Sequence, residues 1–172
     1  MSNGPANLQV WVGDKVVCIR IAGRASFSCS VDFRTLVTTL WQQGHTRFIL
    51  DLTECQLMDS TFLGVLAGLS MRFGNEQGKN GLATLELLNP APRVADLLDN
   101  LGILHLFKLL HGEAPPPDRM SQVQQPACNP DKREVSRTCL EAHKLLMELN
   151  PNNAPKFKDV TRFLEEDLKR QA

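Results

Sequence analysis

The chain has 172 residues, of which 42% are hydrophobic and 22% charged, with nineteen basic and nineteen acidic side chains. This composition excludes a wholly disordered chain. No apolar run approaches the ~18–20 residues of a membrane span, and a net charge of zero argues against non-specific nucleic-acid binding. Residues 1–7 show no secretory signal, and the five cysteines lack C-x-x-C spacing. We therefore expect a cytoplasmic protein with reduced thiols.

Up to about residue 112, short β-branched runs alternate with longer helical patterns, which indicates a mixed α/β fold. The expected strands are residues 9–13, 16–22, 47–52, 82–88 and 106–110. The expected helices are residues 29–43, about 60–74, and 92–100. The order β-β-α-β-α-β-α-β predicts a small mixed β-sheet with helices packed on it.

The composition changes after residue 112. Residues 113–129 are rich in Pro and Gln, which is typical of a linker between residues 1–112 and the rest of the chain. Residues 130–172 predict a helical hairpin whose first helix is capped by Asn129, with Pro130 at its first position. Each helix carries one apolar stripe. The pair must therefore dock on the preceding domain or on a second molecule.

One segment could carry a regulatory function. A buried strand ends near Asp51, and Asp59-Ser60 follows where a helix should begin. Unpaired N–H groups at a helix N-terminus favour an anion, so a phosphate on Ser60 would be tolerated locally. It would add about −1.5 to −2 charges beside Asp59 and repel a docked partner. This hypothesis requires the Ser60 hydroxyl to be presented to solvent.

The motif Asp59-Ser60-Thr61-Phe62-Leu63-Gly64, together with Asp51-Leu52 before it, resembles that of the STAS family. Within that family it is similar to bacterial anti-sigma-factor antagonists, whose pattern is Asp-Ser-[Ser/Thr]-Gly-Leu-Gly. The resemblance covers roughly residues 8–110 and includes the predicted order of elements. It departs from the family at Phe62, where the pattern has Gly.

The resemblance implies a binding module of a partner-switching pathway that regulates transcription. In that family the serine matching Ser60 is phosphorylated by an anti-sigma factor that is itself a serine kinase. The unphosphorylated form binds this kinase and frees a sigma factor. The implied site is therefore Ser60 as the phosphorylated residue, with Asp59, Thr61 and Phe62 as further partner contacts. The ring of Phe62 could pack on the preceding loop, anchor a partner or block the kinase.

Plainer interpretations stay open. Ser60 and Asp59 are also preferred helix caps, and Asp51 could bond the following loop or end in solvent. The C-terminal helices could make the protein a homodimeric scaffold, and the start of the Ser60 helix could bind a small anion. We expect no catalytic residues, no cofactor and no metal, because the four histidines lack metal-ligand spacing and the cysteines have apolar neighbours.

Overall fold

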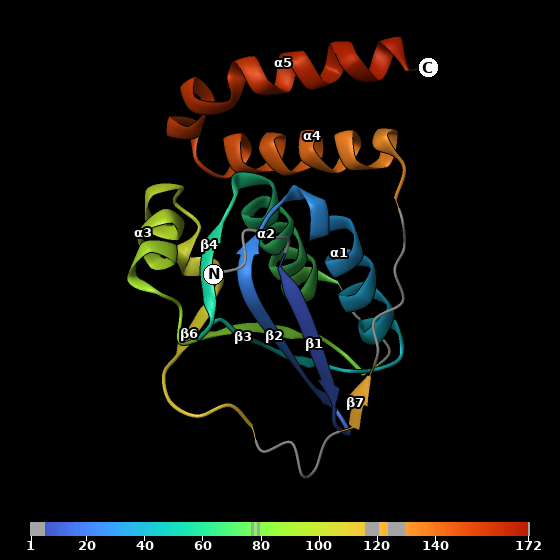
Figure 1. Ribbon diagram of the computed structural model, residues 1–172, viewed down its shortest axis with the longest axis vertical. Helices are drawn as coiled ribbons and strands as arrows, with labels where there is room; N and C mark the ends of the chain where they lie inside the picture. The colour runs from blue at the N-terminus through green and yellow to red at the C-terminus, as the bar shows by residue number, and fades with distance from the viewer. Residues whose placement is uncertain (1–5, 77, 79, 116–120, 124–129, 172) are drawn as a thin grey trace.

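The computed structural model describes residues 6–76, 78, 80–115, 121–123 and 130–171. Its strands form a seven-stranded mixed sheet in the order β6-β5-β3-β2-β1-β7, with β4 paired to β2 outside this path (Figure 1). The strands are β1 (Asn7–Val12), β2 (Val16–Ala25), β3 (Arg47–Asp51), β4 (Cys55–Met58), β5 (Thr84–Leu88), β6 (Lys108–Leu110) and β7 (Ser121–Val123). The predicted mixed α/β architecture is confirmed.

The two N-terminal strands form an antiparallel hairpin, and β2 then pairs in parallel with β3. The sheet continues in parallel through β5 and β6. Two strands lie where no strand was predicted. β4 lies between the predicted strand at residues 47–52 and the predicted helix that begins near residue 60. It pairs with β2 across a register shift at Gly23–Arg24. β7 lies inside the predicted linker and pairs with β1 at the sheet edge.

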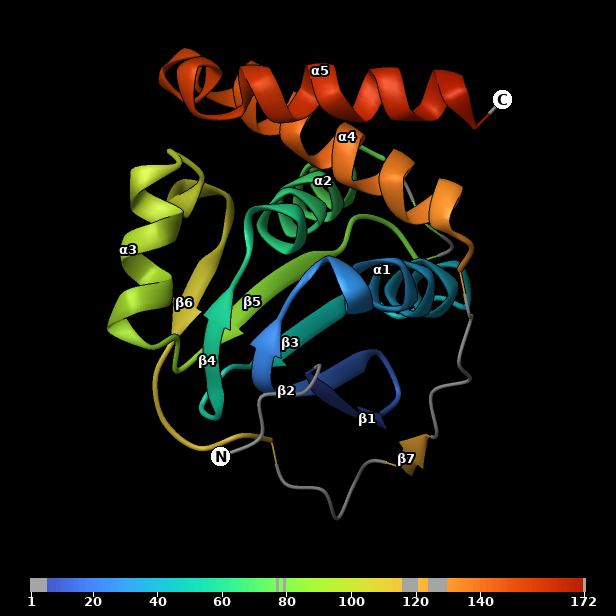
Figure 2. The same cartoon turned by 45° about the horizontal axis from the view of Figure 1, so that its top comes forward.

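The helices cover the sheet and one end of the domain (Figure 2). They are α1 (Phe27–Gln42), α2 (Ser60–Asn75), α3 (Pro92–Asn100), α4 (Lys132–Leu149) and α5 (Ala154–Arg170), with short 3-10 turns at η1 (Leu104–Leu106) and η3 (Pro151–Asn153). The first two pack together on the sheet, while α3 lies beside β4 and β6. No helix of the described residues is long and apolar enough to span a membrane.

The core lies between the sheet and these helices. Phe48 of β3 stacks on Phe73 of α2, with ring centroids 5.1 Å apart, and Phe73 in turn contacts Trp41 of α1. The apolar stripes of α1 and α2 thereby close over the buried strands, as the sequence pattern requires. Within this packing the first turn of α2 is held at one end of the domain.

The C-terminal helical pair lies across that end. We call α4, η3 and α5 (residues 132–170) the C-terminal hairpin. Figure 1 shows α4 crossing over the ends of α1 and α2, with α5 stacked on its outer side. Asn129 lies outside the described residues, and the cap of α4 is Asp131, which accepts a hydrogen bond from the Glu134 N–H at 2.8 Å. The Asn129 cap prediction is therefore wrong by two residues.

Candidate functional site at the start of α2

Asp59 fixes the start of α2 and ties it to α1. Its Oδ1 accepts a hydrogen bond from the Phe62 N–H at 2.9 Å, which caps α2. Its Oδ2 accepts one from the Phe27 N–H at 2.8 Å, at the first residue of α1. One carboxylate thus satisfies two of the N–H donors that helix starts leave unpaired. The predicted capping role of Asp59 is confirmed, and the same contacts place Ser60 at the first position of α2.

Asp51 supports the chain leading to this helix. It is 4% exposed, and its Oδ1 accepts hydrogen bonds from the Thr53 N–H at 3.1 Å and the Thr53 hydroxyl at 2.6 Å. The guanidinium of Arg20 lies 3.3 Å from its other oxygen. Of the two sequence interpretations, the structure selects the one in which Asp51 bonds the following loop. A buried carboxylate needs such partners to offset its desolvation.

Ser60 does not offer a free hydroxyl in this arrangement. It is half-buried, and its Oγ lies 2.8 Å from Nε2 of His143 in α4. The other ring nitrogen of His143 lies 2.6 Å from the Cys139 carbonyl oxygen, which can only accept a hydrogen bond. In the neutral imidazole Nδ1 therefore carries the proton, and the Ser60 hydroxyl donates to Nε2. The expectation of a solvent-presented serine does not hold while α4 is in place.

Thr61 and Phe62 point inward rather than toward a partner. Thr61 is 4% exposed, and Phe62 is fully buried, with its ring 4.9 Å from that of Phe33 in α1. Phe62 therefore packs into the core between α1 and α2 instead of on the preceding loop. Its burial does not fit the expected role of a partner contact. Among the residues at this end of the domain, exposed apolar surface is found instead at Phe27, which is 51% exposed.

Gly64, one turn beyond Ser60, is where α4 comes closest to α2. A Cβ placed on Gly64 would lie 2.6 Å from the Ala142 Cβ and 2.8 Å from its Cα, a separation that real side chains do not adopt. Helices approach this closely only where both carry small residues. The α2–α4 contact is therefore specified by a Gly–Ala pair as well as by the Ser60–His143 hydrogen bond.

The cysteine thiols of the core have the character of small hydrophobic residues. Burial raises the pKa of Cys18 to about 11, with the nearby Asp51 carboxylate adding to the effect. Burial also raises the pKa of Cys29 and of Cys55 above the ordinary value of a thiol. A raised pKa leaves less of the reactive thiolate at neutral pH. The described residues contain no group of three or more His, Cys, Asp or Glu side chains placed to hold a metal.

A cavity of about 490 Å³ lies between α2 and α4. It begins at Gly64 and extends toward Arg72 and Leu145, and neither Asp59 nor Ser60 lines it. The Phe62 N–H at the start of α2 is already bonded to Asp59. The geometry therefore gives no support to the alternative in which the first turn of α2 binds a small anion.

The comparisons with known proteins agree with this architecture. The STAS domain model matches residues 7–114. The chain belongs to the STAS domain family. The anti-sigma factor antagonist SpoIIAA in its unphosphorylated form superposes with a TM-score of 0.53 and 22% identity, over 62% of this chain and 89% of that one.

Two further solved structures share the fold. The phosphorylated form of SpoIIAA, described as a Bacillus cell fate determinant, gives a TM-score of 0.50 at 21% identity, over 62% of this chain and 92% of that one. An anti-sigma factor antagonist from Mycobacterium paratuberculosis gives 0.50 at 15% identity, over 61% and 85%. The STAS match ends at residue 114, so the C-terminal hairpin lies beyond it.

Sequence reasoning missed the residues through which α4 contacts this site. From the sequence, His143 is expected to be an ordinary surface or hydrogen-bonded residue; it is buried, and its partner is Ser60, 83 residues earlier in the chain. Ala142 carries no signal beyond its place on the apolar stripe of α4. A small residue on that stripe facing a Gly in α2 is the one pattern that could have indicated the contact.

Proposed function

We propose that this STAS protein acts by binding, as an anti-sigma-factor antagonist in a partner-switching pathway that regulates transcription. Its partner is an anti-sigma factor with serine kinase activity in the cytoplasm, and phosphorylation of Ser60 ends the complex. The observation that carries the proposal is the position of Ser60 at the N-terminus of α2 beside Asp59, in the family's Asp-Ser motif. The existence of a solved relative in both phosphorylated and unphosphorylated forms supports it.

The proposed mechanism is electrostatic and steric. An unmodified Ser60 is a small hydroxyl on a helix end, whereas a phosphorylated one carries about −1.5 to −2 charges and three additional oxygen atoms. Asp59 already places a carboxylate beside it. A partner surface that fits the hydroxyl would meet both a clash and like charge, so one modification would switch binding without unfolding the domain.

Exchanging Ser60 tests this mechanism. We expect Ser60→Ala to retain the kinase constitutively and Ser60→Asp to retain it poorly, because only the second introduces charge. Tagged variants would be used to capture proteins from the host lysate, with the captured serine kinase identified and quantified by mass spectrometry. Thr35→Asp, at an exposed position of α1, is a matched control for added charge. Equal retention by Ser60→Ala, Ser60→Asp and wild type would end the proposal.

A second candidate function is supported by the outer helix. Val160 and Phe163 on α5 are 42% and 72% exposed, and large apolar side chains in solvent are typical of an association surface. In this alternative the chain is an unphosphorylated scaffold that forms a homodimer through its C-terminal helices. The mass in solution of wild type and of Phe163→Asp separates the two: a dimer that becomes a monomer favours the scaffold.

A further inference from the structure

The C-terminal hairpin occupies the surface on which the proposed function depends. His143 holds the Ser60 hydroxyl, and Ala142 sits on Gly64 one turn later. The half-buried thiol of Cys139 faces Thr61: burial raises the pKa of the thiol, and the Thr61 side chain partly offsets this effect. Three inward positions of α4 thus meet the motif residues of α2.

The interface beneath α4 combines apolar contacts, from Ala142 and Leu146, with buried polar side chains. Thr138 and His143 are 1% and 5% exposed, and each is satisfied by a partner on the domain: Arg34 donates to the Thr138 hydroxyl at 3.0 Å, and Ser60 bonds His143. The buried Asn153 in the turn of the hairpin donates to the Leu101 carbonyl oxygen at 2.9 Å. Polar contacts of this kind are typical of surfaces that associate and separate, whereas permanent interfaces are more apolar.

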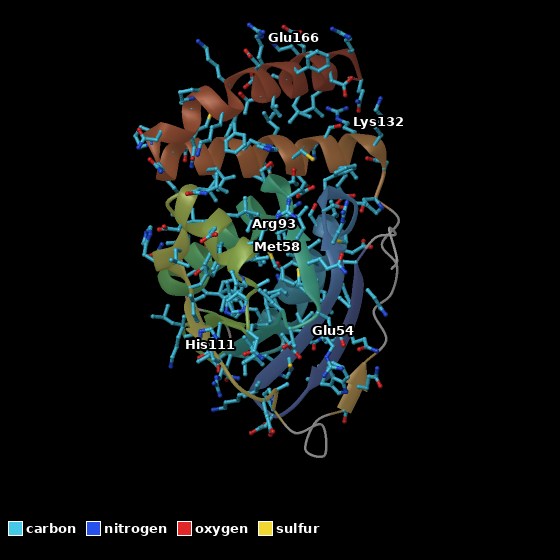
Figure 3. The ribbon with its side chains drawn as sticks, turned by 60° about the vertical axis from the view of Figure 1, so that its left-hand side comes forward. Glu54, Met58, Arg93, His111, Lys132 and Glu166 are labelled. Atoms are coloured by element: carbon cyan, nitrogen blue, oxygen red, sulfur yellow. The ribbon has the colours of Figure 1, made fainter. Side chains whose placement is uncertain are left out.

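The outer helix adds little to this docking. Among its described residues only Thr161 is buried, and Phe157 is the side chain that reaches the core, through its contact with His143 at 4.9 Å between ring centroids. The salt bridge between Lys144 and Glu165, at 2.8 Å, joins α5 to α4 rather than to the domain. Figure 3 shows Glu166 on the outer side of α5, away from the sheet. The hairpin therefore contacts the domain mainly through α4 and its turn, with one further hydrogen bond of 3.4 Å from the Lys156 Nζ in α5 to the Asn100 carbonyl oxygen.

A phosphate on Ser60 is incompatible with this docking. The Ser60 Oγ and His143 Nε2 are 2.8 Å apart, which leaves no room for a phosphoryl group between them. The same surface accepts a helix with a small residue opposite Gly64, which is what α4 supplies.

We propose that the C-terminal hairpin is an intramolecular competitor for the Ser60 surface. It covers this surface in the unmodified protein, and the partner kinase must displace it. A phosphoryl group on Ser60 releases it, because the 2.8 Å between the Ser60 Oγ and the His143 Nε2 cannot hold that group. The inference rests on the proposed function for the identity of the competing partner, but not for its test, which requires this chain alone.

Cys139 provides the readout, because its thiol lies at the α2–α4 interface while Cys18, Cys29 and Cys55 lie in the core. Alkylation by N-ethylmaleimide at pH 8 would be followed peptide by peptide in full-length protein carrying Cys128→Ser. Release of the hairpin alone exposes Cys139, whereas global unfolding exposes all four thiols. The ratio of their rates therefore distinguishes the two events.

Two pairs of variants complete the design. Ser60→Asp adds charge, and Ser60→Ala removes only the hydrogen bond. Ala142→Leu places a large side chain against Gly64 without altering the surface of the domain, and Glu148→Leu puts the same residue on an exposed position of α4. We expect Ser60→Asp and Ala142→Leu to accelerate alkylation of Cys139 at least about tenfold, with the core cysteines unchanged. Glu148→Leu should change it less than about threefold, and Ser60→Ala, which leaves the His143 nitrogen without its partner, should fall between that control and Ser60→Asp.

The inference is overturned if Ser60→Asp leaves the Cys139 rate unchanged. It is also overturned if Ala142→Leu accelerates Cys139 only in step with Cys18, Cys29 and Cys55, because the hairpin would then be an inseparable part of one folding unit. Neither outcome depends on a partner. Failure of the proposed function would show instead as equal kinase retention by the Ser60 variants, with the alkylation pattern intact.

Discussion

Phe62→Ala is expected to lower the free energy of unfolding by about 3–5 kcal/mol. The ring is fully buried and packs against Phe33, so its removal loses burial of apolar surface and leaves a cavity between α1 and α2. Chemical denaturation monitored by circular dichroism measures the change. Phe163→Ala is the matched control, because the same truncation at a 72% exposed side chain should change stability by no more than about 0.5 kcal/mol.

This result decides the role of Phe62. If the residue were a partner contact, the truncation would leave stability close to that of Phe163→Ala and reduce only partner retention. The structure predicts the opposite pattern. It also explains why a large ring is tolerated where the family motif has Gly: the side chain at this position of α2 faces α1 rather than the surface, so it does not obstruct Ser60.

Asp59→Ala is expected to cost about 2–3 kcal/mol of stability, because one carboxylate caps two helices. Each hydrogen bond from a helix N-terminus to a charged oxygen is worth about 1–2 kcal/mol. Asp131→Ala is the matched control, since that side chain caps α4 alone and should cost about 1 kcal/mol. Denaturant unfolding of the two variants provides the comparison.

Asp59→Asn separates the capping role from the charge. An Asn side chain has one acceptor oxygen, so it can bond either the Phe62 N–H or the Phe27 N–H but not both, and about half of the lost stability should return. The carboxylate beside Ser60 would nevertheless be gone, and a phosphate there would meet less repulsion. If Asp59→Asn were as stable as the wild type, the second hydrogen bond would contribute nothing, and the assignment of Asp59 as an acceptor for both helices would be wrong.

The STAS part of the fold was predictable because its signals are local. The strand from Arg47 to Asp51 is short and almost continuously apolar, and α2 begins at a residue pair that favours helix starts. β4 was not predicted because Gln56 and the preceding Glu54 give its segment the polar composition of a loop. Its pairing with β2 depends on a register shift at Gly23, and no local pattern encodes such a shift.

The placement of the hairpin could not be predicted in the same way. The apolar stripe containing Leu146 predicts that one face of α4 is buried, and Leu146 is fully buried. The stripe does not indicate which surface of the domain covers that face. That choice is made by Gly64 and Ala142, which are small, and by the Ser60–His143 pair, whose members are 83 residues apart. Contacts of this kind exist only after the chain has folded.

The motif residues divide in the structure into two groups. Asp59 and Ser60 stand where the motif suggested, at the start of α2, whereas Thr61 and Phe62 turn into the interface and the core. Successive residues of an α-helix are rotated by about 100° around its axis, so adjacent residues of a motif need not share a surface. Ser60 is therefore the residue on which the proposed regulation rests.

Phosphate on Ser60 is the most direct test of that regulation. The protein would be purified from its own host in exponential growth and under stress, and its peptides mapped by mass spectrometry, with Ser60→Ala as the control for site assignment. We expect a phosphate on Ser60 whose occupancy differs between conditions, and none in Ser60→Ala. A Ser60 peptide that is unmodified in every condition, from cells in which the protein is abundant, would contradict the proposed regulation.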